Sequence, residues 1–330
     1  MARFGAYISG SGSCVPQRRL TNADLEKLVE TNDEWIVQRT GIRERRVVGD
    51  GESTVTLALQ AAQRALENAG ISADDLDLII VATLTPELIT PSTACLLQEK
   101  LGIKRNIGAF DMGAACSGFV YSIATASQFI QTGAYKNILV VGAETLTRIV
   151  DYTDRGTCIL FGDAAGAVVL SATEDIHRGI RAFELGADGM DGEMLYVPAG
   201  GSRLPASTET ILNRQHYLKM NGREIYKFAV HQMTNSLKKA MEACNLTAAD
   251  VKLVVPHQVN QRIIDSATEK MGFPKDKVFV NIDRYGNTSA ASVPLALDEA
   301  LRAGACDPGD WIIMVAFGAG LTWASATVKL

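Results

Sequence analysis

The stretch AFDMGAACSGFVYSIATAS, residues 109–127, predicts a short strand that turns sharply into a buried helix. Its apolar lead-in is followed by a corner of small residues and then by a long apolar segment. Cys116 lies at this corner, where unpaired backbone N–H groups and the positive end of a helix dipole favour the thiolate and lower the pKa of the thiol. A free cysteine is more often a small apolar core residue. Cys116 is therefore a candidate nucleophile, and this stretch alone leaves both interpretations open.

Helices and strands alternate along the rest of the chain. Strands are predicted over residues 3–12, 76–83, 137–144 and 161–173. Helices are predicted from Thr21 or Asn22 through Lys27 and beyond, from Ser53 to Gly70, and over Thr93–Leu101. Several strands are continuously apolar, and such strands are buried on both faces. The pattern is typical of an α/β fold in which helices cover a mostly parallel sheet.

The second half of the chain repeats the first. AGISADDLDLIIVAT (69–83) is echoed by CNLTAADVKLVVPHQ (244–258), EKLGI (99–103) by EKMGF (269–273), FDMGAACSGF by NIDRYGNTSA, and ILVVGAE by WIIMVAFGAG. Internal repeats of this kind indicate a duplicated α/β unit. The echo puts Cys116 and Asn287 at equivalent strand-to-helix corners and His257 at the C-terminal end of a buried strand, where ligands gather in open α/β sheets.

The repeat divides the chain into an N-terminal half, residues 1–173, which carries Cys116, and a C-terminal half, residues 174–330, which carries His257 and Asn287. Residues 174–220 are rich in Gly, Pro and polar residues. We expect them to form a surface excursion that lines an entrance rather than a separate domain.

Composition excludes several classes of protein. The net charge of −5 argues against nucleic acid as the main partner, and no apolar run reaches the length of a membrane span. The N-terminal apolar segment is too short and too interrupted by glycine for a secretory signal, so a cytoplasmic location is the default expectation. Six cysteines without a Cys-x-x-Cys pair and only four histidines indicate neither a disulfide framework nor a metal site.

Three candidate residues together suggest acyl-transfer chemistry. The Cys116 thiolate can accept an acyl group from a thioester and hold it covalently. His257 and Asn287 can each donate a hydrogen bond to an enolate oxygen without adding negative charge. His257 could instead be a core histidine and Asn287 an ordinary turn residue, and the segment FGAG (317–320) is either a turn or an oxyanion donor. Their convergence at equivalent ends of a duplicated fold favours catalytic roles for these residues over structural ones.

A further cluster combines Trp35 with several arginines in DEWIVQRTGIRERR. An indole beside guanidinium groups suits a flat, phosphate-bearing ligand, because the ring can stack and arginine can chelate phosphate. A solvated basic loop with one half-buried tryptophan explains the same residues equally well.

The sequence resembles the type III β-ketoacyl-acyl carrier protein synthases of the thiolase superfamily over essentially its whole length. The segments that carry the resemblance are TNADLEKLVETNDEWIVQRTGIRER, AACSGF, TDRGT, FGDAAGA, MNGREIYKFAV, VPHQVNQRII, DRYGNTSAASVPLALDEA and FGAGLTW. The resemblance implies a five-layered αβαβα fold, a homodimer and no cofactor. It also implies a reaction in which acyl-CoA acylates Cys116 and malonyl-acyl carrier protein then loses CO2, with His257 and Asn287 holding the enolate.

The resemblance extends to residues around the triad. The backbone N–H groups of Cys116 and Ala319 resemble the oxyanion donors. Coenzyme A contacts are implied for Trp35, Arg39, Arg155, Gly222 and Asn260, and docking of acyl carrier protein for Arg262, Lys227 and Lys270. Thr90 occupies a position where several relatives carry a phenylalanine that closes the acyl pocket from across the dimer, so we expect primers larger than acetyl to be tolerated.

Two other hypotheses fit the same fold. A starter-unit ketosynthase or acyltransferase of polyketide or other secondary metabolism would use the same triad. A non-catalytic partner of a ketosynthase dimer would not need one, and the intact Cys116, His257 and Asn287 argue against it.

Overall fold

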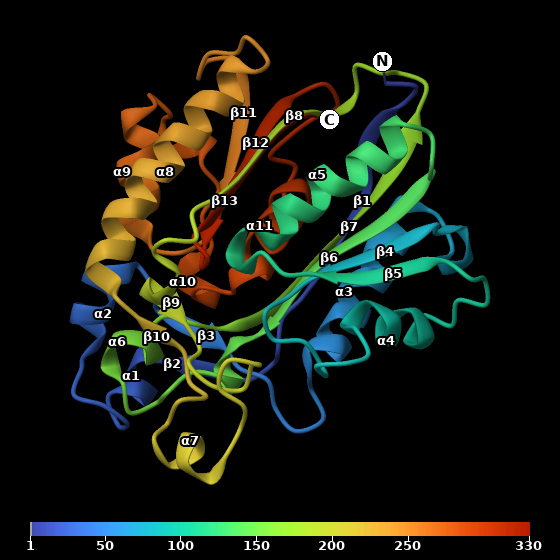
Figure 1. Ribbon diagram of the computed structural model, residues 1–330. Helices are drawn as coiled ribbons and strands as arrows, with labels where there is room; N and C mark the ends of the chain where they lie inside the picture. The colour runs from blue at the N-terminus through green and yellow to red at the C-terminus, as the bar shows by residue number, and fades with distance from the viewer. Residues whose placement is uncertain (1) are drawn as a thin grey trace.

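The computed structural model describes residues 2–330, and its centre is a nine-stranded sheet of order β11-β12-β13-β8-β1-β7-β6-β4-β5 (Figure 1). The strands of this sheet are β1 (Gly5–Cys14), β4 (Leu78–Ala82), β5 (Gly108–Met112), β6 (Asn137–Thr145), β7 (Asp163–Thr173), β8 (Gly179–Ala187), β11 (Val251–Pro256), β12 (Trp311–Gly318) and β13 (Thr322–Lys329).

The sheet consists of two halves with the same strand order. In the N-terminal half β4 pairs in parallel with β5 and β6, and β6, β7 and β1 follow with antiparallel pairing. In the C-terminal half β11 pairs in parallel with β12, and β12, β13 and β8 follow with antiparallel pairing. A parallel bridge from Val254 to Val278 takes the place that β5 has in the first half. The halves meet in a single parallel pair, Ala6 with Gly179.

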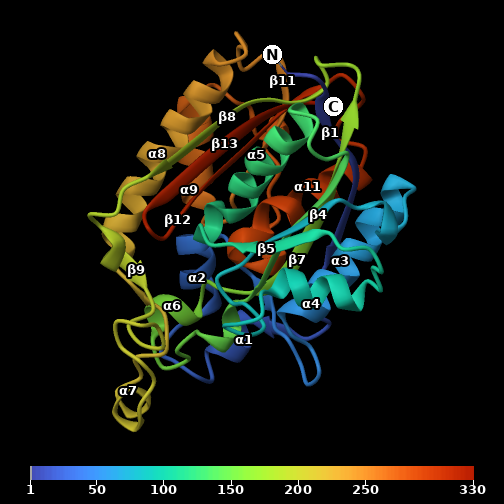
Figure 2. The ribbon, with the colours of Figure 1, turned by 45° about the vertical axis from the view of Figure 1, so that its right-hand side comes forward.

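Helices cover both faces of each half, which gives five layers (Figures 1 and 2). The outer layers are α3 (Thr54–Ala69) with α4 (Thr93–Lys100), and α8 (Gly222–Glu242) with α9 (Gln261–Lys270). The central layer is α5 (Gly118–Gln131) and α11 (Ser292–Arg302), which pack between the two halves of the sheet. The predicted αβαβα, internally duplicated fold is confirmed. The sheet is mixed rather than mostly parallel as predicted, because two strand pairs in each half are antiparallel.

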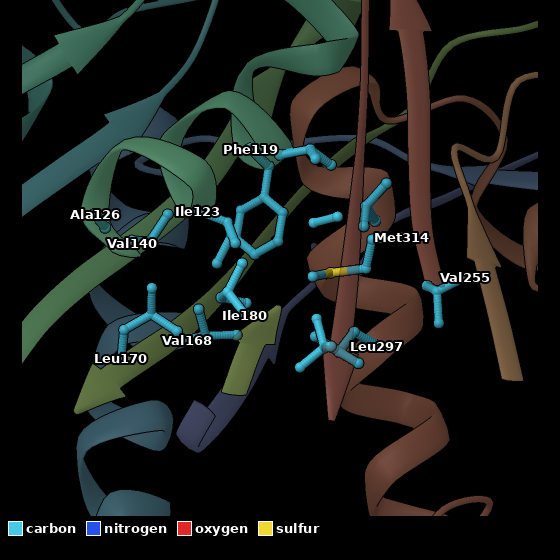
Figure 3. Packing of buried hydrophobic residues seen from close by; sticks show 14 of the residues in the cluster. Phe119, Ile123, Ala126, Val140, Val168, Leu170, Ile180, Val255, Leu297 and Met314 are labelled. Carbon is cyan, nitrogen blue, oxygen red and sulfur yellow. The ribbon is translucent and has the colours of Figure 1, made fainter. Parts of the chain in front are cut away.

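The central layer is held by apolar side chains from both halves. Phe119 of α5 lies between Val168 on one side and Met314 on the other, and all three are fully buried (Figure 3). Truncation of a buried phenylalanine to alanine typically costs about 3–5 kcal/mol. Because α5 begins at the Cys116 corner and α11 follows Asn287, this core fixes both corners relative to each other.

The predicted helix 54–69 forms as expected. Ser53 precedes its first turn, and Gly70 ends it in the left-handed conformation with φ of 68°. Half of its buried residues are alanine, so the helix packs closely on β1. A side chain at Gly12 would meet the backbone of Ala61 at 2.5 Å, which explains the glycine there.

Two local predictions differ from the structure. The helix expected from residue 21 through Lys27 and beyond is the single turn α1 (Asn22–Leu25), and the Glu26 side chain that follows accepts a hydrogen bond from the backbone N–H of Asp33. Residues 174–220 are not all surface excursion, since β8 pairs with β13 along its whole length. Only Gly179 and Ile180 of β8 are fully buried, so the strand lacks the apolar run that marks the others.

The remaining elements are short and surround the carboxyl ends of the parallel strands. They are α1, α2 (Asp33–Thr40), α6 (Arg155–Cys158), α7 (Thr208–Leu212), α10 (Ile282–Tyr285), β2 (Arg19–Thr21), β3 (Glu44–Arg46), β9 (Leu195–Tyr196) and β10 (Lys219–Met220). Among the described residues no helix combines the length and apolar character that a membrane span requires.

Candidate active site

Cys116 lies where β5 turns into α5. The turn includes Ala115 in the left-handed conformation, with φ of 45°, and one 3₁₀ turn over Ala115–Ser117. The thiol is only 6% exposed, and this burial raises its pKa to about 12, although the nearby Ser289 hydroxyl lowers it. The expectation of a lowered pKa is therefore wrong for the protein without substrate, because desolvation outweighs the helix terminus.

His257 follows β11 and is completely buried. Its Nδ1 lies 2.6 Å from the Oγ of Ser292, and its ring makes an edge-to-face contact with Phe317 at 5.7 Å. Nε2 has no hydrogen-bond partner within residues 2–330. Burial lowers the pKa of the imidazole to about 3, so the ring is neutral at pH 7.

Asn287 is held by the backbone on both sides. Its N–H donates to the carbonyl of Leu160 at 2.8 Å, and its own carbonyl accepts from the N–H of Gly162 at 3.0 Å. The side-chain Oδ1 accepts a hydrogen bond from the backbone N–H of Ser289 at 2.9 Å. The Nδ2 amide group is therefore left as the donor that Asn287 can offer to a ligand.

The three residues line one cavity. Its other walls are mostly apolar: Leu160, Phe161, Leu195, Met220, Ile225, Phe228, Val259, Phe317, Gly318 and Leu321. A second cavity also borders Cys116 and extends past Leu84, Leu146, Val197 and Leu218. Cys116 thus lies between two apolar spaces, an arrangement that suits a thiol receiving an acyl chain.

The echo between the two corners is real but its register differs from the prediction. Each corner contains a 3₁₀ turn whose first residue is left-handed, Ala115 in one and Ser289 in the other, and a helix follows each turn. Aligning these residues makes Ala290 the counterpart of Cys116. Asn287 lies three residues earlier and follows α10, so it is not at the strand-to-helix corner that was predicted for it.

Ala319, which the resemblance suggests as a second oxyanion donor, lines the same cavity as Ala115 and Cys116. It borders the second cavity, and the preceding Gly318 packs directly on the Cys116 backbone. The hydroxyl of Thr322 lies 3.1 Å from the carbonyls of both Ala114 and Ala319, so it links the two segments.

Four of the five residues predicted to contact coenzyme A lie close together, namely Trp35, Arg39, Arg155 and Asn260. The guanidinium groups of Arg39 and Arg155 lie 5.2 and 5.0 Å from the centre of the Trp35 ring. The side chain of Asn260 donates to the backbone carbonyl of Arg39 at 2.9 Å. Gly222 begins α8 between Met220 and Ile225, which both line the Cys116 cavity.

The predicted docking residues are all exposed, but they do not form one tight group. Arg262 lies over the ring of Tyr226, the residue next to Lys227, and Lys227 forms an ion pair with Glu224 at 2.9 Å. Lys270 lies at the other end of α9, about 12 Å from Arg262 at 1.5 Å rise per residue.

Thr90 is exposed and borders neither cavity at Cys116. Its neighbours Leu88 and Ile89 border an open surface cavity that shares Leu84 and Val197 with the second Cys116 cavity. The segment before Pro91 therefore lies near the far end of the apolar space.

Sequence reasoning missed Ser292, Thr322 and Glu144. Glu144 is fully buried at the end of β6, where Thr85 donates to it from both N–H and hydroxyl at 3.2 and 2.5 Å, and burial raises the pKa of the carboxyl to about 7. A single acidic residue ending an apolar strand was the available signal. Within residues 2–330 no three His, Cys, Asp or Glu side chains gather to hold a metal ion.

The duplicated five-layer fold, with a buried cysteine at one strand-to-helix corner, defines a thiolase-like acyl-transferring enzyme. Family models described as 3-oxoacyl-[acyl-carrier-protein (ACP)] synthase III and its C-terminal part match residues 110–189 and 241–330. The β-ketoacyl-[acyl-carrier-protein] synthase III of Caldanaerobacter subterraneus subsp. tengcongensis is 52% identical over 99% of this chain and 98% of its own. The chain belongs to the 3-oxoacyl-[acyl-carrier-protein] synthase III family.

Solved structures agree with this assignment. The 3-oxoacyl-[acyl-carrier-protein] synthase III from Aquifex aeolicus VF5 has a TM-score of 0.91 and 47% identity, covering 99% of this chain and 100% of its own. The priming β-ketosynthase from the R1128 polyketide biosynthetic pathway has the same TM-score of 0.91 at 34% identity, covering 100% of this chain and 97% of its own.

Proposed function

We propose that this chain catalyses the initiating condensation of bacterial-type fatty-acid synthesis. Cys116 attacks the thioester carbonyl of an acyl-CoA primer, and coenzyme A leaves with the thiol proton. Malonyl-acyl carrier protein then loses CO2, and His257 and Asn287 hold the resulting enolate oxygen. The enolate carbon attacks the acyl-cysteine, which releases 3-oxoacyl-acyl carrier protein and leaves the Cys116 thiolate, and this takes up a proton from solvent. Both substrates supply the chemistry, so the proposal includes no cofactor.

One observation carries this proposal: Cys116, His257 and Asn287 line a single apolar cavity. Nδ1 of His257 and Oδ1 of Asn287 already have partners, which leaves Nε2 and Nδ2 for a ligand. Neither group carries charge, so neither opposes a developing enolate. The carbonyl of the acyl-cysteine would face the backbone N–H groups of Cys116 and Ala319.

The test is reconstitution with radiolabelled acyl-CoA and malonyl-acyl carrier protein. We expect labelled 3-oxoacyl-acyl carrier protein and one CO2 per product from the unmodified chain. We expect neither product nor a labelled protein adduct from Cys116→Ala. Labelled product from the alanine variant, or no adduct on the unmodified chain, would contradict the proposal.

The same proposal includes binding of acyl-CoA by Trp35, Arg39, Arg155, Gly222 and Asn260, and docking of acyl carrier protein on the exposed cations Arg262, Lys227 and Lys270. These cations permit docking of an acidic partner despite the net charge of −5, since docking depends on local charge. We also propose a cytoplasmic homodimer. The exposed apolar side chains of Leu88, Ile89, Ile211 and Leu212 support a surface that a second copy of the chain covers. Sedimentation equilibrium tests whether the chain forms this dimer.

Primers larger than acetyl are also part of the proposal. Thr90 is small, and the second cavity is apolar and extends from Cys116 toward the segment that carries it. Turnover of acetyl-CoA compared with branched and medium-chain acyl-CoAs tests this, and a strict acetyl preference would contradict it. The polyketide starter-unit alternative is less favoured, since the polyketide relative is 34% identical and the β-ketoacyl-[acyl-carrier-protein] synthase III of Caldanaerobacter is 52% identical.

A further inference from the structure

A buried hydroxyl lies directly behind the imidazole of His257. Ser292 is the first residue of α11 and is 1% exposed, and its Oγ lies 2.6 Å from Nδ1 of His257. The backbone N–H of Gln258 donates to the same Oγ at 3.4 Å. These contacts join the central helix to the end of β11, although the two residues are 35 positions apart in the chain.

The direction of this hydrogen bond follows from the number of donors and acceptors. The Oγ of Ser292 already accepts from Gln258, and Nδ1 is the one acceptor that the described residues offer to its proton. If Nδ1 carried a proton and donated it, the serine proton would be buried without a partner, which is costly. The serine therefore donates, and the neutral ring carries its proton on Nε2.

We propose that Ser292 is a positioning residue that holds His257 as the Nε2–H tautomer, so that the ring can donate to the enolate. This inference rests on the proposed function, because it assigns His257 a donor role. An Nδ1–H ring would present a lone pair to the enolate instead, and two lone pairs repel. The ring of Phe317, whose centre lies 5.7 Å from the centre of the imidazole, restricts the ring further.

The duplicated fold supplies an independent argument. The repeat aligns His257 with Ala82, and the two corners align Ser292 with Gly118. In the N-terminal half this pair makes a plain apolar contact, since a side chain at Gly118 would lie 3.1 Å from Cβ of Ala82. The C-terminal half has a polar pair at the same place. Packing of the repeat needs no hydroxyl there, which points to a role in orienting the imidazole.

The first test reads the tautomer directly. The chain has four histidines, so selective ¹⁵N labelling of the imidazoles gives few signals, and His257→Ala assigns the one of interest. We expect a single species protonated on Nε2, and a second tautomer to appear in Ser292→Ala but not in Ser292→Thr. An Nδ1–H signal in the unmodified chain, or an unchanged spectrum in Ser292→Ala, would overturn the inference.

The second test separates the half-reactions. Ser292→Ala is expected to slow decarboxylation of malonyl-acyl carrier protein by the acylated enzyme about tenfold, with acylation of Cys116 unchanged and activity restored in Ser292→Thr. Ser127→Ala, which removes another buried helix hydroxyl, is the control and should have no effect. If His257→Ala abolishes decarboxylation and Ser292→Ala does not slow it, this inference alone fails. If His257→Ala has no effect, the proposed role of His257 fails with it.

Discussion

Gly318→Ala tests whether the close contact between β12 and the Cys116 corner matters for chemistry. A Cβ atom at residue 318 would lie 2.7 Å from the backbone N of Cys116 and 3.0 Å from its Cβ. Backbone atoms cannot rotate away as a side chain does, so the corner or the strand must move. Overpacking of this kind costs about 1–3 kcal/mol. The displaced N–H groups belong to the expected oxyanion site, where losing one donor costs about 10²–10³-fold in rate.

Single-turnover acylation of Cys116 is measured by quenched flow and intact-protein mass spectrometry. The stability of each variant is measured by thermal unfolding. We expect Gly318→Ala to acylate at least tenfold more slowly and to lose a few degrees in Tm. Gly113→Ala is the matched control, because residue 113 lies near the same corner and its Cβ would meet no atom within 4 Å. Normal acylation by Gly318→Ala, or equal damage from Gly113→Ala, would refute the reasoning.

Three further predictions follow from charge and burial. Burial raises the pKa of Cys116 to about 12, so the fraction of thiolate increases with pH over the whole assay range. The acylation rate should therefore rise from about pH 6 to about pH 9. A plateau of the rate near neutrality would contradict this prediction. Burial raises the pKa of Glu144 from 4.5 to about 7, so the folded state binds this proton more tightly than the unfolded state does. The protonated carboxyl therefore contributes fully to the free energy of unfolding below pH 4.5, and this contribution is lost as the pH rises through 7. At about 1.4 kcal/mol per pKa unit the loss is at most about 3–4 kcal/mol. Glu144→Gln should flatten the pH dependence of urea unfolding, and an unchanged dependence would count against this prediction. Arg262→Glu should raise the KM for malonyl-acyl carrier protein about tenfold without changing the rate of Cys116 acylation. Lys104, an exposed residue that follows α4, provides the control, and Lys104→Glu should change neither quantity. If both variants raise the KM equally, docking does not depend on Arg262.

The fold could be predicted because its strands are marked by apolar runs and its repeat is visible in the sequence. β4 and β6 were found from continuous apolar segments, and α3 from its alanine stripe and the glycine that ends it. β8 was missed because most of its side chains are exposed or half-buried and its backbone pairing with β13 holds it in place. Strand pairing of this kind depends on the partner strand and leaves little trace in local composition.

The sequence predicted which residues belong to the site, but not their contacts or the pKa of the thiol. Cys116 and His257 were identified from their places after buried strands, and Asn287 from an echo whose register was wrong; all three nevertheless line one cavity. The thiol pKa was predicted in the wrong direction, because the helix terminus is local in sequence whereas burial depends on distant segments such as β12. Ser292 was missed for the same reason, since its contact with His257 exists only once α11 packs against β11.

The central claim is that one cavity performs two half-reactions, with Cys116 in the first and neutral donors in the second. Asn287→Asp tests it most directly, since the variant keeps the size of the side chain and an oxygen for the Ser289 N–H but replaces the free Nδ2 donor with a negatively charged oxygen. The measurement is intact-protein mass after acyl-CoA and again after malonyl-acyl carrier protein. We predict that the acyl adduct forms normally and then persists without release of CO2. Discharge of the adduct at the rate of the unmodified chain would contradict the account.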